Sequence, residues 1–234
     1  MLQKLFYNRK LVVSIFVVLI IASTLVALGP MLYSAYMGRG VATEGVNAQG
    51  AKEASTDLNG QWQVVTGNAK NFTSVGFTID EVLPSERRAT SGSTNSVDGT
   101  AVVESEKLQE ATIIVDMSTL TTDNDVRDNN MKRKLFMTDQ YPEATFKVTD
   151  TVNLSQVPDD GTVTRVPLKG DMTIKGKTNS VSGEFDVLRD GKQLIVGGDV
   201  PINRQDFDIK SPEFIAAEIA DEGTVNVRLT LEKK

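Results

Sequence analysis

The chain has 234 residues, a net charge of −6 at pH 7, and neither cysteine nor histidine. The lack of both residues excludes disulfides, thiol chemistry, Ser-His-Asp catalysis and histidine-based zinc or copper sites. The first 37 residues contain three basic and no acidic side chains, so the rest of the chain carries a charge of −9. Because nucleic acids bind basic surfaces, we expect no nucleic-acid partner for a domain this acidic.

A long apolar segment near the N-terminus predicts a membrane anchor. Residues 11–28 form a run of 18 residues without charge, glycine or proline, which is long enough to span the hydrocarbon of a bilayer. Tyr33 and Tyr36 follow this run, and such aromatic rings favour the headgroup layer. We therefore predict a transmembrane anchor over residues 11–37.

The charges around this segment predict its orientation. Three basic residues precede the run, and the first acidic residue is Glu44. The positive-inside tendency then keeps residues 1–10, a basic flank, in the cytoplasm. The β domain of this single-pass protein would be extracellular or periplasmic.

A cleaved signal peptide is the alternative, but its apolar core is usually about 7 to 15 residues long and ends in a small-residue cleavage site. Residues 26–28, Val-Ala-Leu, match such a site poorly.

Residues 38–56 differ in composition from the segments on both sides. They have no hydrophobic periodicity, few large apolar residues, and many Gly, Ala, Ser and Thr. This composition predicts a flexible stalk, whose 19 residues would place its ends roughly 25 Å apart. A folded domain beginning at Asp57 would then reach back to the membrane surface.

From Asp57 onward, apolar residues alternate with polar ones, which is typical of strands with one buried face. The alternation is clearest over residues 146–154, 166–175 and 225–231, and weaker over residues 62–66, 75–82, 111–117, 181–187 and 194–202. We expect turns at Asp98-Gly99, Asp190-Gly191 and Asp221-Glu222-Gly223, since Asp-Gly between alternating runs is a strong hairpin signal. Eight or more short strands predict an all-β domain over residues 57–234, an antiparallel sandwich or barrel.

Residues 121–136 break the alternation. Their acids come early and their bases late, which predicts a short helix with Thr122 or Asp123 as its cap, covering one end of the β structure. The aspartates also suggest calcium, but Arg127 and Asp128 fall at positions 5 and 6 of an EF-hand loop, where an oxygen ligand and a glycine are needed. We therefore predict helix capping and solvation for these residues, and no metal site.

No catalytic group stands out in the sequence. Two carboxylates for glycoside hydrolysis would meet only in the fold, but such sites usually accompany a groove rich in Trp and Tyr. Trp62 is the single tryptophan of the chain. We therefore predict no catalytic residue and no cofactor.

The phenylalanines of the β region have two interpretations. They are either ordinary core residues or the lining of an apolar cavity, because a barrel of about eight strands either fills with side chains or holds one ligand. Periodicity alone does not separate these alternatives.

Three sequence blocks resemble the YceI-like family of polyisoprenoid-binding, lipocalin-like proteins. Within residues 118–146, the resemblance lies in Thr119-Leu120, Arg127-Asp128, Leu135-Phe136, Tyr141-Pro142 and Phe146. Residues 170–176, Gly-Asp-Met-Thr-Ile-Lys-Gly, resemble the family's Gly-x-Leu-Thr-hydrophobic-x-Gly segment. Residues 203–209 resemble its Arg-x-Asp-Phe-x-Ile segment. The blocks follow the family's order, and with Trp62 the resemblance extends from residue 58 to the C-terminus.

The resemblance implies an eight-stranded antiparallel, lipocalin-like barrel that encloses a long apolar chain, such as a polyprenyl phosphate or a quinone tail. Removing each CH₂ from water contributes about 0.8 kcal/mol, so a dry tunnel binds hydrocarbon without a catalytic group. The candidates for the tunnel wall are Phe77, Ile79, Ile113, Val115, Phe146, Val148, Leu168, Met172, Ile174 and Phe185. We assign Arg127-Asp128 a structural role, as a partly buried ion pair or a helix-cap contact that fastens the short helix to the barrel.

Two functional hypotheses follow. The first is a membrane-tethered carrier or buffer for an isoprenoid lipid, a binding protein rather than an enzyme. The second is a ligand-free structural or interaction module of the cell envelope, whose solid barrel presents an acidic surface to a partner protein. The sequence leaves the identity of the lipid and the oligomeric state open, with a homodimer among the options.

Overall fold

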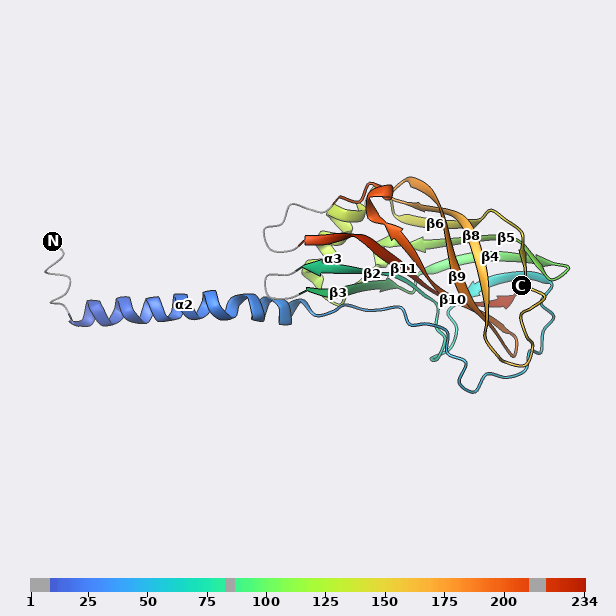
Figure 1. The fold of residues 1–234 in the computed structure, drawn as a ribbon, viewed down its shortest axis with the longest axis horizontal. Helices are drawn as coiled ribbons and strands as arrows, with labels where there is room; N and C mark the ends of the chain where they lie inside the picture. Colours follow the sequence, from blue (N-terminus) through green and yellow to red (C-terminus); the bar gives the residue numbers. More distant parts are fainter. Residues whose placement is uncertain (1–8, 83–86, 211–217) are drawn as a thin grey trace.

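The computed structural model describes residues 9–82, 87–210 and 218–234. One long helix, α2 (Arg9–Met37), projects from one end of a β-rich domain (Figure 1). The strands are β1 (Gly60–Val65), β2 (Ser74–Val82), β3 (Arg87–Thr94), β4 (Val97–Glu104), β5 (Lys107–Asp116), β6 (Glu143–Val148), β7 (Val152–Asn153), β8 (Thr164–Ile174), β9 (Lys177–Asp190), β10 (Gln193–Asn203) and β11 (Glu218–Lys233). The short helical segments are η1 (Met117–Thr119), α3 (Asp125–Asn130), η2 (Met131–Phe136) and η3 (Arg204–Phe207).

Eight strands close into an antiparallel barrel, as the resemblance to the YceI-like family implies. Their order is β1-β4-β5-β6-β8-β9-β10-β11, and the ring closes because β11 also pairs with β1. The short β1 meets only the last residues of β11, with Val64 opposite Leu231. The first part of β11 pairs instead with β2, which pairs with β3. One end of the barrel is therefore built with β1 and the opposite end with the β2–β3 hairpin.

The end formed by β2 and β3 also carries the short helices. Ser93 of β3 and Thr121 exchange two backbone hydrogen bonds of 2.9 Å, which connect the hairpin to the segment after η1. α3 and η2 follow, and Figure 1 places α3, β2 and β3 at the end from which α2 emerges. We call this the helix-side end, and we call the opposite end, where Leu58 and Trp62 lie, the far end.

α2 covers all of the predicted anchor, residues 11–37, and continues through Pro30. Its most apolar window has a mean hydropathy of 3.0, and none of that window is buried against the domain. By length and composition the helix is able to cross a membrane. A signal sequence near an N-terminus has the same properties.

Residues 38–56 differ from the predicted flexible stalk, because they lie along the outside of the barrel from the helix-side end to the far end (Figure 1). Near α2, the N–H of Val41 donates to the carbonyl of Ser91 at 3.1 Å. At the far end, the N–H of Ser55 donates to the carbonyl of Gly191 at 2.8 Å. We call this segment the strap. Backbone hydrogen bonds hold it near both ends, and such bonds require no hydrophobic periodicity in the sequence.

The strap covers a polar patch on the outer face of the barrel. Arg228 of β11 is only 1% exposed, and its guanidinium lies 4.4 Å from the centre of the Phe72 ring. Its Nε donates to the carbonyl of Phe72 at 3.0 Å, and its Nη1 donates to the carbonyl of Gly45 in the strap at 3.2 Å. Asn71 and Asn47 also exchange two hydrogen bonds of 2.8 Å. These contacts fix the middle of the strap to the wall.

Two strands, β3 and β4, are absent from the sequence prediction. The buried side chains of β3 belong to Thr90, Ser91, Ser93 and Thr94, on either side of the buried Gly92, so no apolar alternation marks the strand. Asp98-Gly99, expected as a turn, lies within β4, and Asp221-Glu222-Gly223 lies within β11 beside a shift in register. Both turn predictions are therefore wrong, whereas Asp190-Gly191 does connect β9 to β10.

Candidate functional site

A long cavity runs through the core of the barrel. Its lining extends from Arg127 and Ile219 at the helix-side end to Leu108 and Leu194 near the far end, and its volume is about 240 Å³. Packed protein interiors contain few voids larger than a water molecule. A cavity needs only about 10–15 Å³ to hold one water, so this cavity is far larger than an ordinary packing gap. Because a volume of about 240 Å³ is distributed along a lining that reaches from one end of the barrel toward the other, the cavity is narrow and elongated.

The ten residues that the sequence predicts as tunnel wall all line this cavity. They are Phe77 and Ile79 of β2, Ile113 and Val115 of β5, Phe146 and Val148 of β6, Leu168, Met172 and Ile174 of β8, and Phe185 of β9. Within each strand they are spaced by even numbers of residues, so the pleat directs them to the same face. Their contact with a lipid stays a prediction.

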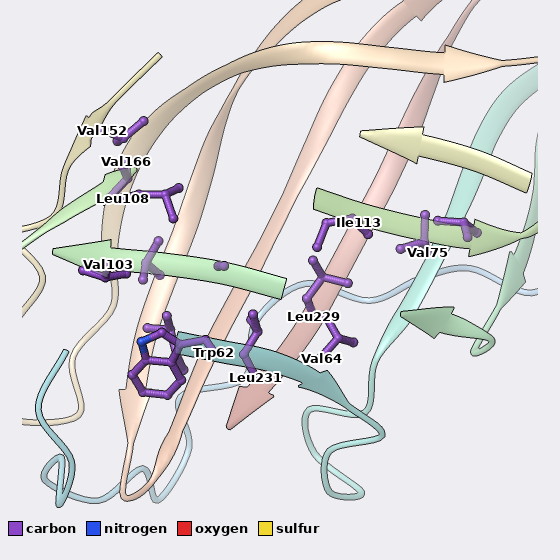
Figure 2. Packing of buried hydrophobic residues seen from close by; sticks show 14 of the residues in the cluster. Trp62, Val64, Val75, Val103, Leu108, Ile113, Val152, Val166, Leu229 and Leu231 are labelled. Atoms are coloured by element: carbon purple, nitrogen blue, oxygen red, sulfur yellow. The ribbon is translucent and has the colours of Figure 1, made fainter. Parts of the chain in front are cut away.

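Packed apolar side chains close the far end. Trp62 is 2% exposed, and its indole N–H donates to the carbonyl of Leu58 at 2.8 Å. Figure 2 shows Trp62 beside Leu231, with Val103 and Leu108 above them. Trp62 and Leu58 do not belong to the cavity lining. Both are buried at the far end of the barrel, and we call this pair the plug.

The charged residues of the described cavity lining are Glu81, Arg127 and Arg204, and all three lie toward the helix-side end. Glu81 accepts a hydrogen bond of 2.7 Å from the Thr90 hydroxyl. Arg204 donates from Nε to the carbonyl of Ala220 at 2.9 Å and forms an ion pair with Asp221. The remaining lining is almost wholly apolar, so the cavity has one polar end and one apolar end.

Arg127 is the least satisfied of these charged groups. Its side chain is 8% exposed, and Nη2 donates to the carbonyls of Met37 at 2.8 Å and Gly38 at 3.0 Å. Its Nε and Nη1 are buried and have no hydrogen-bond partner among the described residues. Burial lowers the pKa of Arg127 below its usual value, although the nearby Glu81 carboxylate acts to raise it. Two donor nitrogens of this side chain, Nε and Nη1, are therefore available to a polar group at that end of the cavity.

Arg127 and Asp128 each fasten α3, but not by pairing with one another. Asp128 accepts hydrogen bonds from the Thr121 hydroxyl at 2.6 Å, the Thr122 hydroxyl at 2.6 Å and the Thr122 N–H at 2.7 Å. The helix cap is Asn124, which accepts from the N–H of Arg127. The prediction of Thr122 or Asp123 as the cap is therefore wrong by one or two residues.

Sequence reasoning missed Glu81 and Arg204 as parts of the cavity lining. Glu81 follows Phe77 and Ile79 at the same spacing of two, so its inward position was available from the alternation. Arg204 lies in η3, outside any strand, and no periodic signal marks it. Phe136 of η2, one of the phenylalanines that the sequence leaves with two interpretations, also lines the cavity, and its ring meets that of Phe77 edge-on at 6.0 Å between centroids.

An eight-stranded antiparallel barrel with a long apolar cavity is the architecture of lipocalin-like proteins. The YceI-like domain model matches residues 62–231, and the chain belongs to this family. The resemblance found in the sequence is thereby confirmed. A comparison with curated proteins gives no match.

Two solved structures share the fold. BcnA of Burkholderia cenocepacia is 19% identical, with a TM-score of 0.53, and the match covers 66% of this chain and 95% of that one. A polyisoprenoid binding domain from Saccharophagus degradans, implicated in plant cell wall breakdown, is 15% identical with a TM-score of 0.56. That match covers 74% of this chain and 98% of the domain.

Proposed function

We propose that the chain is a membrane-tethered binding protein for a long-chain isoprenoid lipid, of the polyprenyl phosphate or quinone type. It acts as a carrier or buffer and not as a catalyst. The observation that carries this proposal is the narrow cavity, which is apolar over its length and polar at one end. An amphiphile with one long chain matches both features, because its chain gains about 0.8 kcal/mol for each CH₂ removed from water.

The tether in this proposal rests on α2 and on the charges around it. The helix is long and apolar enough to span a bilayer, and three basic residues precede its apolar core. The positive-inside tendency then places the barrel on the outer side of the membrane. Membership of the YceI-like family, together with the polyisoprenoid binding domain among the structural neighbours, supports a lipid as the ligand.

Truncation of the cavity wall tests the proposal. In a solid core, Met172→Ala or Phe185→Ala would remove about 2–5 kcal/mol of unfolding free energy. At the wall of an open cavity, we expect a smaller loss of stability and a clear loss of affinity for polyprenyl phosphate. Both quantities are measured on the full chain in detergent, by chemical unfolding and by lipid titration.

Leu58→Ala is the matched control, because Leu58 is 5% exposed yet does not line the cavity. This variant should lose stability and keep its lipid affinity. If the Met172 and Leu58 variants behave alike in both measurements, the barrel is a solid structural module and the proposed function is wrong.

A further inference from the structure

The barrel holds the C-terminal end of α2 with side chains from its helix-side end. Nη1 of Arg88 donates to the carbonyl of Ser34 at 2.8 Å, and Nη2 of Arg127 donates to that of Met37 at 2.8 Å. The last four carbonyls of a helix have no partner within the helix, and cations are favourable at this end of the helix dipole. The two guanidinium groups therefore act as a C-terminal cap supplied by another part of the chain.

The chain leaves this junction without a flexible linker. Immediately after α2, the N–H of Ser91 donates to the carbonyl of Arg39 at 2.9 Å, and Val41 donates to Ser91 in return. Between them, Gly40 has φ +85° and lies so close to the Ser91 carbonyl that no Cβ would fit. Helix, junction and strap are thus connected to β3 over consecutive residues, and the barrel is held in one orientation relative to α2.

The contacts between the barrel and α2 lie at the same level of the helix as the tyrosines that follow the apolar run of the predicted anchor. Ser34, which Arg88 contacts, lies between Tyr33 and Tyr36, and these tyrosines are 40% and 67% exposed. The side-chain amide of Asn124 donates to the carbonyl of Tyr36 at 3.3 Å. Because exposed tyrosines next to an apolar span favour the headgroup layer, the helix-side end of the barrel lies at the level of that layer.

The helix-side end of the barrel exposes both apolar and basic side chains. Val126 of α3 is 53% exposed and Val82 of β2 is 38% exposed. Basic residues lie on the neighbouring elements of this end, Arg87 and Arg88 in β3 and Arg133 and Lys134 in η2, together with the exposed carboxylates of Asp80 in β2 and Asp125 in α3. Exposed apolar side chains beside basic ones are typical of contact with lipid headgroups.

We infer that the helix-side end of the barrel sits in the headgroup layer of the membrane that α2 spans, and that the polar end of the cavity faces the lipid leaflet. The barrel then exchanges its ligand directly with that leaflet and does not shuttle it through water. This inference rests on the proposed tether and on the proposed lipid ligand. It adds a second contact, between the barrel surface and lipid headgroups, to the tether that α2 provides.

The absence of cysteine from the chain allows a direct test by single-cysteine labelling. An environment-sensitive fluorophore is attached to Val126→Cys, at the helix-side end, or to Lys107→Cys, an exposed position at the start of β5 near the far end. The full chain is reconstituted in phosphatidylcholine vesicles containing headgroup-labelled nitroxide lipid. We expect strong quenching of the Val126 label and at least a fivefold weaker effect on the Lys107 label.

A second variant tests the junction. Arg88→Gln combined with Arg127→Gln removes the cap from α2, so we expect the quenching of the Val126 label to fall toward that of the Lys107 label. Arg228→Gln is the control, because it also removes a buried guanidinium but leaves the junction intact. Equal quenching of the two labels in the otherwise unaltered chain, or quenching unaffected by loss of the cap, would overturn the inference.

Uptake of polyprenyl phosphate by the same vesicle-bound chain separates this inference from the proposed function. Quenching at Val126 without lipid uptake would leave the orientation standing and refute the lipid-binding function. Uptake without quenching would leave the function standing and refute the orientation.

Discussion

The two ends of the barrel are closed in different ways, and the difference separates stability from function. At the far end, Trp62 and Leu58 form an apolar plug whose one polar group is satisfied by a hydrogen bond. At the helix-side end, Arg127 is buried with two donors unpaired. Burying apolar surface is favourable, whereas a buried donor without a partner costs about 1–3 kcal/mol. The far end therefore stabilises the fold, and the helix-side end is kept polar at a cost in stability.

The largest effect that we expect comes from the far end. Trp62→Ala should lower the free energy of unfolding by about 3–5 kcal/mol, because it removes the largest side chain of the plug. Chemical denaturation of the full chain measures this loss. Trp62→Phe should keep much of the stability that the alanine variant loses. A loss below about 1 kcal/mol for the alanine variant would show that the plug is not the main closure of the barrel.

The next effect concerns the strap. Gly40→Ala should detach the strap beside β3, since alanine at this positive φ and close approach costs of the order of 1–3 kcal/mol. Hydrogen exchange of the Val41 and Ser91 amides would report it as faster exchange. Gly45→Ala is the control, because open space surrounds that position. Equal protection in both variants would contradict the tight contact between the strap and the barrel.

A smaller and more specific effect is expected for the buried arginines. Arg127→Gln should weaken binding of polyprenyl phosphate by about tenfold, since a hydrogen bond to a charged group contributes about 1.5–3 kcal/mol. Arg228→Gln should lower stability without changing affinity, because Arg228 lies outside the cavity under the strap. Isothermal titration of both variants checks this contrast, and equal affinities for the two would remove Arg127 from the binding site.

The smallest expected effect is on the thermal stability of the protein at acidic pH. Hydrogen bonds from the hydroxyl and the N–H of Ser118 hold the pKa of Asp116 below its ordinary value of 3.8. A carboxyl with a lowered pKa adds stability above the unfolded-state pKa, and this stability disappears as the pH falls through the folded-state value. Thermal unfolding between pH 5 and pH 3 should therefore show a slightly smaller drop in Tm for Asp116→Asn than for the natural sequence. A larger drop in the variant would contradict this role.

The barrel interior was predictable because it obeys one rule. Inward residues recur every second position and are mostly apolar in β2, β5, β6, β8 and β9, so the alternation indicated the inward positions of the ten predicted wall residues, all of which line the cavity. The same rule missed β3, whose buried residues are hydroxyl-bearing, and it passed over Glu81 because a carboxylate was not expected to point inward.

The strap and the junction were not predictable from local patterns. The ends of the strap are fixed by backbone hydrogen bonds to β3 and to the β9–β10 turn, which place no demand on side-chain polarity, and its middle is fixed by Asn71 and Arg228 from distant parts of the sequence. The contact between Arg127 and Met37 joins residues 90 positions apart. Only the three-dimensional fold reveals that residues 38–56 are docked on the barrel and that the C-terminal end of α2 is capped by barrel side chains.

The most direct test of lipid binding is mass spectrometry of what the full chain carries. The protein is extracted from membranes in mild detergent, purified, and measured intact under native conditions and after solvent extraction. We expect a bound isoprenoid lipid, with a mass that distinguishes a polyprenyl phosphate from a quinone, at up to one molecule per chain. An empty barrel that also fails to take up either lipid when it is supplied would contradict the proposed function.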